Sequence, residues 1–511
     1  RLLSTEPFIT PVAWTSFQTG SDVADHGILD YRYWDHRQGR LCLNQTSRVA
    51  GETLFDAVAA AWGQVVSLNL PMTLPPRLGE PHIILGGLDS PSLERVLAAS
   101  PAFAAKLQAA GIQYDLQPVW RRRPRTLAEL TAGVDQTARV FQGRAAAARL
   151  ADEQTDWSLL VVQFQTLDAL QHRLWHLRQE DSQADPAWIG EARRAMWALD
   201  AACGELLELA ARRSAAVVVL SDHGFGPFHG KVSVPRILER QGLLVPSAGT
   251  ARLLWHARRL SFKLQRWQWK RRNPGQSSAS LALAARPRLP LDWNRTRAVT
   301  LHGDLAAMVY SNRPERSGGG PLRTSGEVRR AAEETCAALR AARHPQLDTP
   351  LFADAYLVAD RFDCDPLDRC WPDVVGIPAD GWHTRSKWDR ADTLLLPDDD
   401  LTGTHRREGV LMVAAAGVTA GRHHEAHLRD VAPTILQLLG LGAPATMTGS
   451  PLPLLPEQQA GVASRGGGSL EPVLTAGAFE GQSPEGLSPE GLSNEQMAII
   501  EERLRDLGYM D

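Results

Sequence analysis

The sequence predicts an α/β protein with a central, mostly parallel sheet, and three observations support this fold class. Short apolar runs, most of them rich in β-branched residues, alternate with helical patterns along the chain. Each run is nearly continuous in apolar residues, as expected for strands that are buried on both faces. Polar or glycine-rich turns follow these runs. Ligands of such folds gather at the carboxyl ends of the strands, so these turns are candidate positions for a site.

The individual elements follow from the same patterns. The expected strands are Val65–Leu70, Ile83–Leu88, Leu159–Gln165, Ala216–Leu220 and Val410–Ala414. Helical spacing of apolar residues predicts helices at Gly51–Trp62, Ser92–Ala99, Pro101–Ala110, Leu127–Asp152, Glu191–Arg212 and Leu428–Leu439.

The composition excludes several classes of protein. The 511 residues include 55 Lys+Arg and 58 Asp+Glu, and this near-balance argues against a sequence-specific nucleic-acid binder. The sequence contains no run of 18 apolar residues that would predict a membrane span, and no signal peptide is recognisable. The five cysteines are scattered without CxxC spacing, so neither a disulfide framework nor a thiolate zinc site is expected. We therefore expect a cytoplasmic, reducing location.

The chain is expected to hold one core with two insertions. The core comprises residues 1–230, 291–311 and 401–455, a basic helical insertion spans 231–290, and a small α+β insertion spans 312–400. Residues 456–492 read as a flexible linker, and 493–511 as a C-terminal helix. Residues 252–272 carry eight basic residues and no acidic ones. We expect a solvated helix here, and the alternatives are a peripheral contact with an anionic membrane or a lip that steers an anionic substrate.

Polar residues follow two of the predicted strands. Asp222 and His223 directly follow Ala216–Leu220, where oxygen and nitrogen donors suit a divalent metal ion; the alternative is a turn Asp beside a surface His. Asp168 and His172 follow Leu159–Gln165, and their i,i+4 spacing places both on one helix face, where an ordinary ion pair is the alternative.

Two further residues complete the candidate site. His405 lies in a Gly-Thr-His-Arg loop, where the alternative is a solvated histidine. Thr10 precedes Pro11, so we expect it to be the N-cap of a helix that ends near Gly20. A helix N-terminus attracts phosphate, although the hydroxyl could merely cap the helix. Together the six residues offer the inventory of a two-metal site, with ions about 4 Å apart.

The ordered set of motifs resembles the alkaline phosphatase superfamily, in particular its type I phosphodiesterase/nucleotide pyrophosphatase-like branch and bacterial predicted phosphohydrolases. The resemblance spans nearly the whole chain. The motifs are P-x-I-T-P-x-A-W-T-S-x-x-T-G (Pro7–Gly20), H-G-I (His26–Ile28), N-x-P-M-T-x-P-P (Asn69–Pro76), D-x-x-x-H (Asp168–His172), S-D-H-G (Ser221–Gly224), T-H-R-x-E-G (Thr404–Gly409) and D-V-A-P-T-I-L-x-L-L-G (Asp430–Gly440).

The resemblance implies a three-layer sandwich and a role for each site residue. Thr10 falls at the nucleophile position. Asp168, His172 and His405 match the ligands of one metal ion, while Asp222 and His223 match ligands of a second ion that Thr10 would also touch. The implied cofactors are two divalent ions. Zinc is the expected metal, and manganese is the chemically compatible alternative.

Two positions depart from the family pattern. Relatives carry one more Asp ligand after their first strand, and the resemblance implies that this strand would lie upstream of Arg1. Nucleotide pyrophosphatases also place an Asn shortly after H-G-I, where this chain has Asp30-Tyr31, so Asn44 is the substitute substrate-binding candidate.

The resemblance implies a hydrolase that cleaves a small phosphoester, of the phosphodiester or pyrophosphate type, through a covalent phosphothreonine. Phosphomonoester and phosphonate-ester hydrolysis use the same metal core and stay open. The alternative from another class is a non-catalytic binding module that retains the fold.

Overall fold

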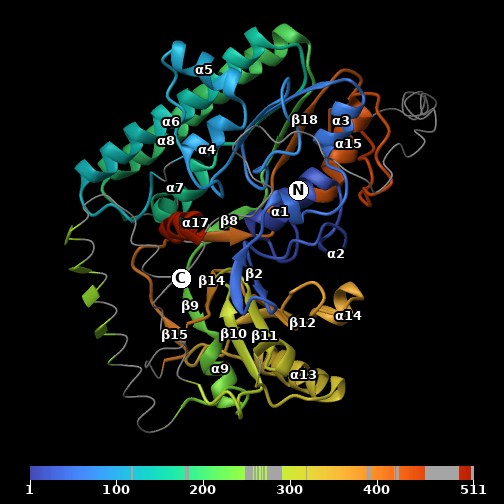
Figure 1. Cartoon of the computed structure of the whole chain (residues 1–511). Helices are drawn as coiled ribbons and strands as arrows, with labels where there is room; N and C mark the ends of the chain where they lie inside the picture. The colour runs from blue at the N-terminus through green and yellow to red at the C-terminus, as the bar shows by residue number, and fades with distance from the viewer. Residues whose placement is uncertain are drawn as a thin grey trace. The chain divides into compact units, whose positions relative to one another are not determined.

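The computed structural model describes the chain as two compact units (Figure 1). Unit 1 comprises residues 1–28, 45–226 and 405–491, and unit 2 comprises 29–44, 227–404 and 492–511. The described residues are 1–116, 119–178, 183–247, 291–317, 319–387, 393–418, 420–421, 425–454 and 494–507, with nine positions between 257 and 272. The expected linker and most of the expected basic insertion therefore lie outside the described residues.

The centre of unit 1 is a parallel three-stranded sheet. Its order is β5 (Ile83–Gly86), β4 (Gln64–Leu70) and β6 (Trp157–Val162). Both neighbours run parallel to β4, with Val66 opposite Ile83 on one side and Leu160 on the other. β-branched and other apolar residues fill these strands because both faces are covered by helices.

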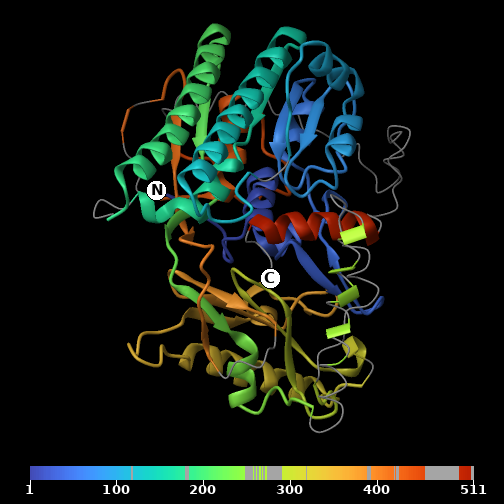
Figure 2. The ribbon, with the colours of Figure 1, turned by 90° about the vertical axis from the view of Figure 1, so that its left-hand side faces the viewer.

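The two faces of this sheet contribute to two separate hydrophobic clusters. Val65 and Leu70 pack with α1 (Thr10–Thr19), α3 (Leu54–Ala60) and α15 (Val431–Leu438). Val66 and Leu68 pack on the other side with α4 (Leu93–Ala98), α5 (Pro101–Ala109) and α6 (Leu127–Gln154). The long helix α8 (Pro186–Arg213) lies beside α6 (Figure 2). Alternation along one strand thus builds a helix–sheet–helix arrangement.

Other strands of unit 1 pair outside this sheet. β7 (Val217–Leu220) runs antiparallel to β18 (Leu411–Ala414), so the parallel arrangement expected from the sequence does not extend to this pair. β1 (Leu2–Leu3) lies between β17 (Glu408–Gly409) and β19 (Ala426–His427). The remaining elements of unit 1 are α2 (Val23–His26), η1 (Thr46–Arg48), α7 (Thr166–Leu174), η2 (Trp175–Leu177) and η3 (Leu428–Asp430).

Unit 2 is built on an antiparallel sheet. Its order is β10 (Ala298–His302), β11 (Ala307–Ser311), β13 (Val374–Pro378) and β12 (Phe352–Leu357), and α13 (Ser325–Ala341) packs on it. Residues 291–311 were expected to belong to the α/β core. In the structure they form β10 and β11, which pair within the antiparallel sheet of unit 2.

Shorter elements complete unit 2. They are β2 (Arg32–Asp35), β3 (Arg40–Leu43), β9 (Gly230–Ser233), α9 (Val234–Arg240), α12 (Pro314–Ser317), α14 (Val358–Phe362), β14 (Trp382–Arg385), β15 (Leu395–Leu396) and α17 (Asn494–Leu507). The chain passes from one unit to the other within β8 (Gly224–Pro227) and again within β16 (Gly403–Arg406).

The α/β fold class is confirmed, and each of the five predicted strands is present within a few residues. Several boundaries differ from expectation. The strand predicted at Leu159–Gln165 ends at Val162, and the helix predicted at Leu428–Leu439 is divided into η3 and α15. α1 has Ile9 rather than Thr10 as its N-cap, so the prediction that Thr10 caps this helix is wrong, whereas Gly20 ends it in the left-handed region as expected. In the described part of the chain, every helix is too short or too polar to cross a membrane.

A buried histidine links α1 to the start of the next segment. His26 Nδ1 accepts a hydrogen bond from the Ile28 amide at 3.1 Å, so Nε2 carries the proton and donates to Ser16 Oγ at 2.9 Å. The ring is fully buried, and burial lowers its pKa to about 3. The folded protein therefore holds His26 neutral.

This arrangement predicts a pH-dependent stability. The unfolded chain binds a proton at His26 below about pH 6.5, whereas the folded protein does so only near pH 3, so stability is complete above pH 6.5 and falls toward pH 3. His26→Gln removes this titration. The difference in unfolding free energy between wild type and variant should shrink by about 2 kcal/mol from pH 7 to pH 5. Urea denaturation at both pH values measures it, and a constant difference would contradict the buried neutral ring.

Candidate metal centre

The predicted site residues of unit 1 come from the ends of its strands. Asp168 and His172 lie on α7, shortly after β6, and Asp222 and His223 follow β7 directly. His405 is a residue of β16. Strands that end near one another thus bring together residues that are more than 200 positions apart in the sequence.

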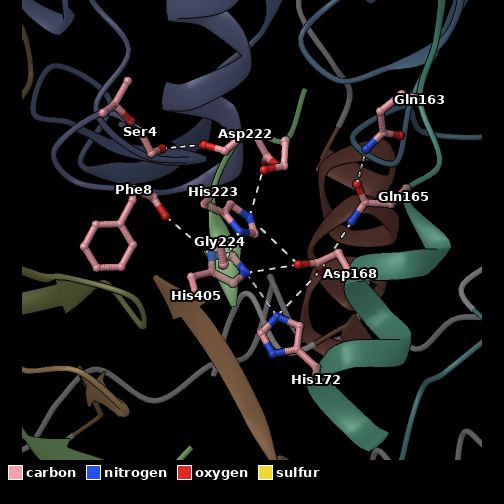
Figure 3. A network of polar contacts seen from close by, with 12 residues as sticks. Ser4, Phe8, Gln163, Gln165, Asp168, His172, Asp222, His223, Gly224 and His405 are labelled. Carbon is pink, nitrogen blue, oxygen red and sulfur yellow. Dashed lines mark hydrogen bonds and ion pairs between the residues drawn. The ribbon is translucent and has the colours of Figure 1, made fainter. Parts of the chain in front are cut away.

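Asp168 is the centre of this group (Figure 3). Its Oδ1 lies 3.2 Å from His405 Nε2 and 3.8 Å from His223 Nε2. Its Oδ2 lies 3.6 Å from His172 Nε2. One carboxylate therefore faces three imidazoles, each through the same ring nitrogen.

The imidazoles also lie close to one another. His172 Nε2 and His405 Nε2 are 3.1 Å apart, and the rings of His223 and His405 stack with centroids 3.5 Å apart and an interplanar angle of 20°. Asp222 Oδ2 adds a second carboxylate 3.3 Å from His223 Nε2. Five of the six predicted residues therefore converge on one point.

Backbone carbonyls determine which nitrogens of two rings are available. His405 Nδ1 lies 3.4 Å from the Phe8 carbonyl, and His223 Nδ1 lies 3.1 Å from the Gly224 carbonyl. A carbonyl only accepts, so both Nδ1 atoms donate, and in the neutral rings Nε2 keeps a lone pair. The carbonyls thereby fix the orientation of both rings and present Nε2 as the atom that can bind a metal ion.

The electrostatics of the group are strongly perturbed. Burial acts to raise the pKa of Asp168, but His172, His405 and His223 outweigh it, so this pKa lies far below its usual range. Burial and the Asp168 charge raise the pKa of Asp222 well above its usual value. Burial and the neighbouring His405 lower the pKa of His223. An ionised Asp168 beside a neutral His223 is the combination of protonation states that binds a cation.

The donor set fits a divalent metal ion. Asp168, His223 and His405 each offer one ligand atom, and these atoms lie within 4.8 Å of one another. Imidazole and carboxylate donors are those of catalytic zinc sites. Thr10 is 1% exposed, and its Oγ1 has no hydrogen-bond partner among the described residues. A buried hydroxyl left in this state is costly, and an ion or a phosphate oxygen would satisfy it.

An aromatic wall covers one side of the imidazoles. The ring of Phe225 lies 4.8 Å from that of His172 in an edge-on geometry and 5.5 Å from that of His405. Trp175 packs behind Phe225, with centroids 5.6 Å apart. Such a wall lowers the local dielectric and holds the rings in place. Phe225 was not among the predicted site residues, although its position directly after S-D-H-G places it next to the candidate metal ligands in the sequence.

Two other histidines and Asn44, the candidate for substrate binding, make contacts of their own. His176, which continues the helical stripe of Asp168 and His172, bonds Arg123 Nη2 at 3.0 Å instead. His427 lies half-buried in β19 and caps η3, while His423 lies outside the described residues. Asn44 belongs to unit 2, and its amide donates to the Asp30 carbonyl at 2.7 Å. Its proposed contact with substrate stays a prediction.

The fold and this group of side chains define an α/β protein with a candidate metal centre at its strand ends. The model of the type I phosphodiesterase/nucleotide pyrophosphatase family matches residues 1–409, and the chain belongs to this family. Its members hydrolyse phosphoester bonds, so the enzyme class expected from the sequence is confirmed. No curated protein matches the sequence.

Several solved structures resemble the chain at low identity. Human ectonucleotide pyrophosphatase/phosphodiesterase 5 has 11% identity and a TM-score of 0.45, over 88% of this chain and 87% of that one. Phosphonoacetate hydrolase from Sinorhizobium meliloti has 15% identity and a TM-score of 0.49, over 86% of each chain. The alkaline phosphatase PafA has 13% identity and a TM-score of 0.49, over 89% of this chain and 90% of that one.

The geometry predicts that metal binding depends on Asp168. Zinc should raise the melting temperature of the wild type, because an ion that binds only the folded state stabilises it. Asp168→Asn removes the charge that the three imidazoles surround, so it should abolish most of this shift. Asp156→Asn is the matched control, since Asp156 is a surface carboxylate of the same unit. Equal zinc-induced shifts in both variants, measured by scanning calorimetry, would argue against the centre.

Proposed function

We propose that this chain is a metal-dependent hydrolase that cleaves a small phosphodiester or pyrophosphate-type substrate at a two-metal site. The single observation that carries this proposal is the buried convergence of Asp168 with three imidazoles and a second carboxylate. Membership of the type I phosphodiesterase family supports the reaction class.

The proposed ligands fall into two sets. Asp168, His172 and His405 would hold one divalent ion, and Asp222, His223 and Thr10 would hold the other. The 3.1 Å approach of the His172 and His405 nitrogens supports the first set, and the 3.3 Å contact between Asp222 and His223 supports the second. Asp168 Oδ1 lies between His405 and His223, so it adjoins both sets. Zinc is the ion we expect from these donors, and manganese is chemically compatible.

Thr10 is the proposed nucleophile. Divalent ions in such a site neutralise phosphoryl oxygens and lower the pKa of a hydroxyl. Thr10 would give up its hydroxyl proton to water, and its oxygen would attack phosphorus, forming an O–P bond while the bond to the leaving oxygen breaks and that oxygen keeps the electron pair. Water would then displace Thr10 from the phosphothreonine and regenerate its hydroxyl. The buried Thr10 Oγ1 has no hydrogen-bond partner among the described residues, which supports this role because an ion or a phosphoryl group could engage it.

This mechanism predicts that Thr10→Ala retains metal but loses hydrolysis. We expect turnover of bis(p-nitrophenyl) phosphate to fall about a thousand-fold or more, because the covalent step is removed. Metal content by mass spectrometry should stay close to that of the wild type. Thr10→Ser restores a hydroxyl and should recover part of the rate.

Thr15→Ala is the matched control, since Thr15 lies on the same helix and donates to the Pro11 carbonyl. It should leave turnover within a few-fold of the wild type. Full activity in Thr10→Ala with metal bound would exclude the phosphothreonine. The ratio of diester to p-nitrophenyl phosphate rates in the wild type distinguishes a diesterase from a monoesterase.

A further inference from the structure

A continuous line of hydrogen-bonded side chains runs from the interior of unit 1 to Asp168. Gln165 Nε2 donates to Asp168 Oδ2 at 3.5 Å, and Gln163 Nε2 donates to Gln165 Oε1 at 2.7 Å (Figure 3). Asn69 Nδ2 donates to Gln163 Oε1 at 2.8 Å, and Arg144 Nη2 donates to Asn69 Oδ1 at 2.8 Å. The line therefore has a cation at one end and the central carboxylate at the other.

The direction of this line is fixed by its two ends. A guanidinium can only donate, and an ionised carboxylate can only accept. Each amide between them must then accept through its oxygen from the Arg144 side and donate through its nitrogen toward Asp168. No amide can flip without breaking two bonds, and hydrogen bonds aligned in this way strengthen one another.

The fold builds this line from specific local features. Asn69 has φ +70°, in the left-handed region that Asn tolerates, and the β4–β5 register shifts between Leu68 and Leu70 at this position. The resulting bulge points the Asn69 amide at Gln163, whose backbone amide donates to the Leu68 carbonyl at 3.0 Å. The N-x-P-M-T-x-P-P motif therefore contributes its first residue to the line.

The far end of the line is held firmly. Arg144 is 3% exposed on the inner face of α6, its guanidinium lies 3.8 Å from the centroid of the Tyr114 ring, and it also donates to the Asp115 carbonyl. Its Nε has no hydrogen-bond partner among the described residues, so the contacts of Nη2 with Asn69 and the Asp115 carbonyl hold this buried guanidinium. Its bond to Asn69 is one of those contacts, so disturbing the line disturbs an anchored residue rather than a mobile one.

We propose that Arg144, Asn69, Gln163 and Gln165 form a positioning network that fixes the rotation of the Asp168 carboxylate. Gln165 holds Oδ2, and this orientation leaves Oδ1 directed at His405 and His223. The inference rests on the proposed function, because a fixed carboxylate matters here through the ion that it binds. These four residues are positioning residues, since they act through Asp168 and touch neither the substrate nor the ion.

The network predicts an effect that is transmitted over distance. Gln165→Ala removes the direct donor, and loss of an outer-shell partner of a metal ligand costs about 10- to 100-fold in metal affinity. Arg144→Met leaves Gln165 in place but removes the fixed donor at the far end, so the amides can reorient. We expect a loss of zinc affinity in the same direction, about several-fold. The double variant should lose less than the product of the two single losses, because both act on one line.

The experiment is a zinc competition titration against a chromophoric chelator, with melting temperature and kinetics measured on the same full-length preparations. Asn69→Gly is measured as a second single variant beside Arg144→Met. Gly adopts the positive φ of this position and removes the side-chain amide. The control is Ser100→Ala, which removes a buried hydrogen bond to the Ile84 amide in the same unit but outside the line. In the metal-loaded enzyme we expect kcat to fall in the network variants while KM changes little.

The outcomes separate this inference from the proposed function. Weaker zinc binding in Arg144→Met or Asn69→Gly, with metal-free stability like that of Ser100→Ala, supports the network. Unchanged zinc affinity in folded Asn69→Gly, while the wild type binds zinc and hydrolyses the diester, overturns the network alone. A wild type that neither binds zinc nor hydrolyses either ester overturns the proposed function, and the inference with it.

Discussion

The centre of unit 1 depends on one electrostatic constraint, which is an ionised carboxylate buried among three imidazoles. Asp168 is largely shielded from water, with 15% of its side chain exposed, and its carboxylate faces three imidazole nitrogens and the amide of Gln165. His223 is itself buried, and burial lowers its pKa and favours its neutral state. A cation is the natural complement of an ionised carboxylate beside imidazole nitrogens.

The surrounding structure can be understood as the means of holding that arrangement. β6 and β7 deliver one carboxylate each from their ends, and backbone carbonyls at Phe8 and Gly224 orient two of the rings. Phe225 presses on His172 and His405 from one side. Bulk packing of the sheet by α1 and α6 positions the strands, while only a few directional contacts position the reacting atoms.

Much of this could be predicted from the sequence because two kinds of signal are local. Continuous apolar runs identified β4, β5, β6, β7 and β18, and polar residues directly after them marked Asp168, Asp222 and His223. The boundary at Val162 was missed because Phe164 suggests that the strand continues past the polar Gln163, whereas the chain already turns to form the loop that carries Gln163 and Gln165. The N-cap of α1 was misplaced by one residue because Pro is tolerated throughout the first turn of a helix, so Thr before Pro does not fix which residue is the N-cap. Arg144 was beyond reach, since its role depends on contacts across 75 residues and on a bulge at Asn69.

One feature of the pairing pattern has a consequence for biosynthesis. Leu2 and Leu3 lie opposite Gly409 and Glu408 on one side and Ala426 and His427 on the other, and Phe8 contacts His405. Leu2, Leu3 and Phe8 therefore wait during synthesis for partners that are made about 400 residues later. Closing so large a loop is slow, and the early apolar segments stay exposed until then. Incomplete chains cannot assemble the His405 contact, so a nascent chain should need chaperone protection for most of its synthesis, and the candidate metal centre can form only after His405 has been made.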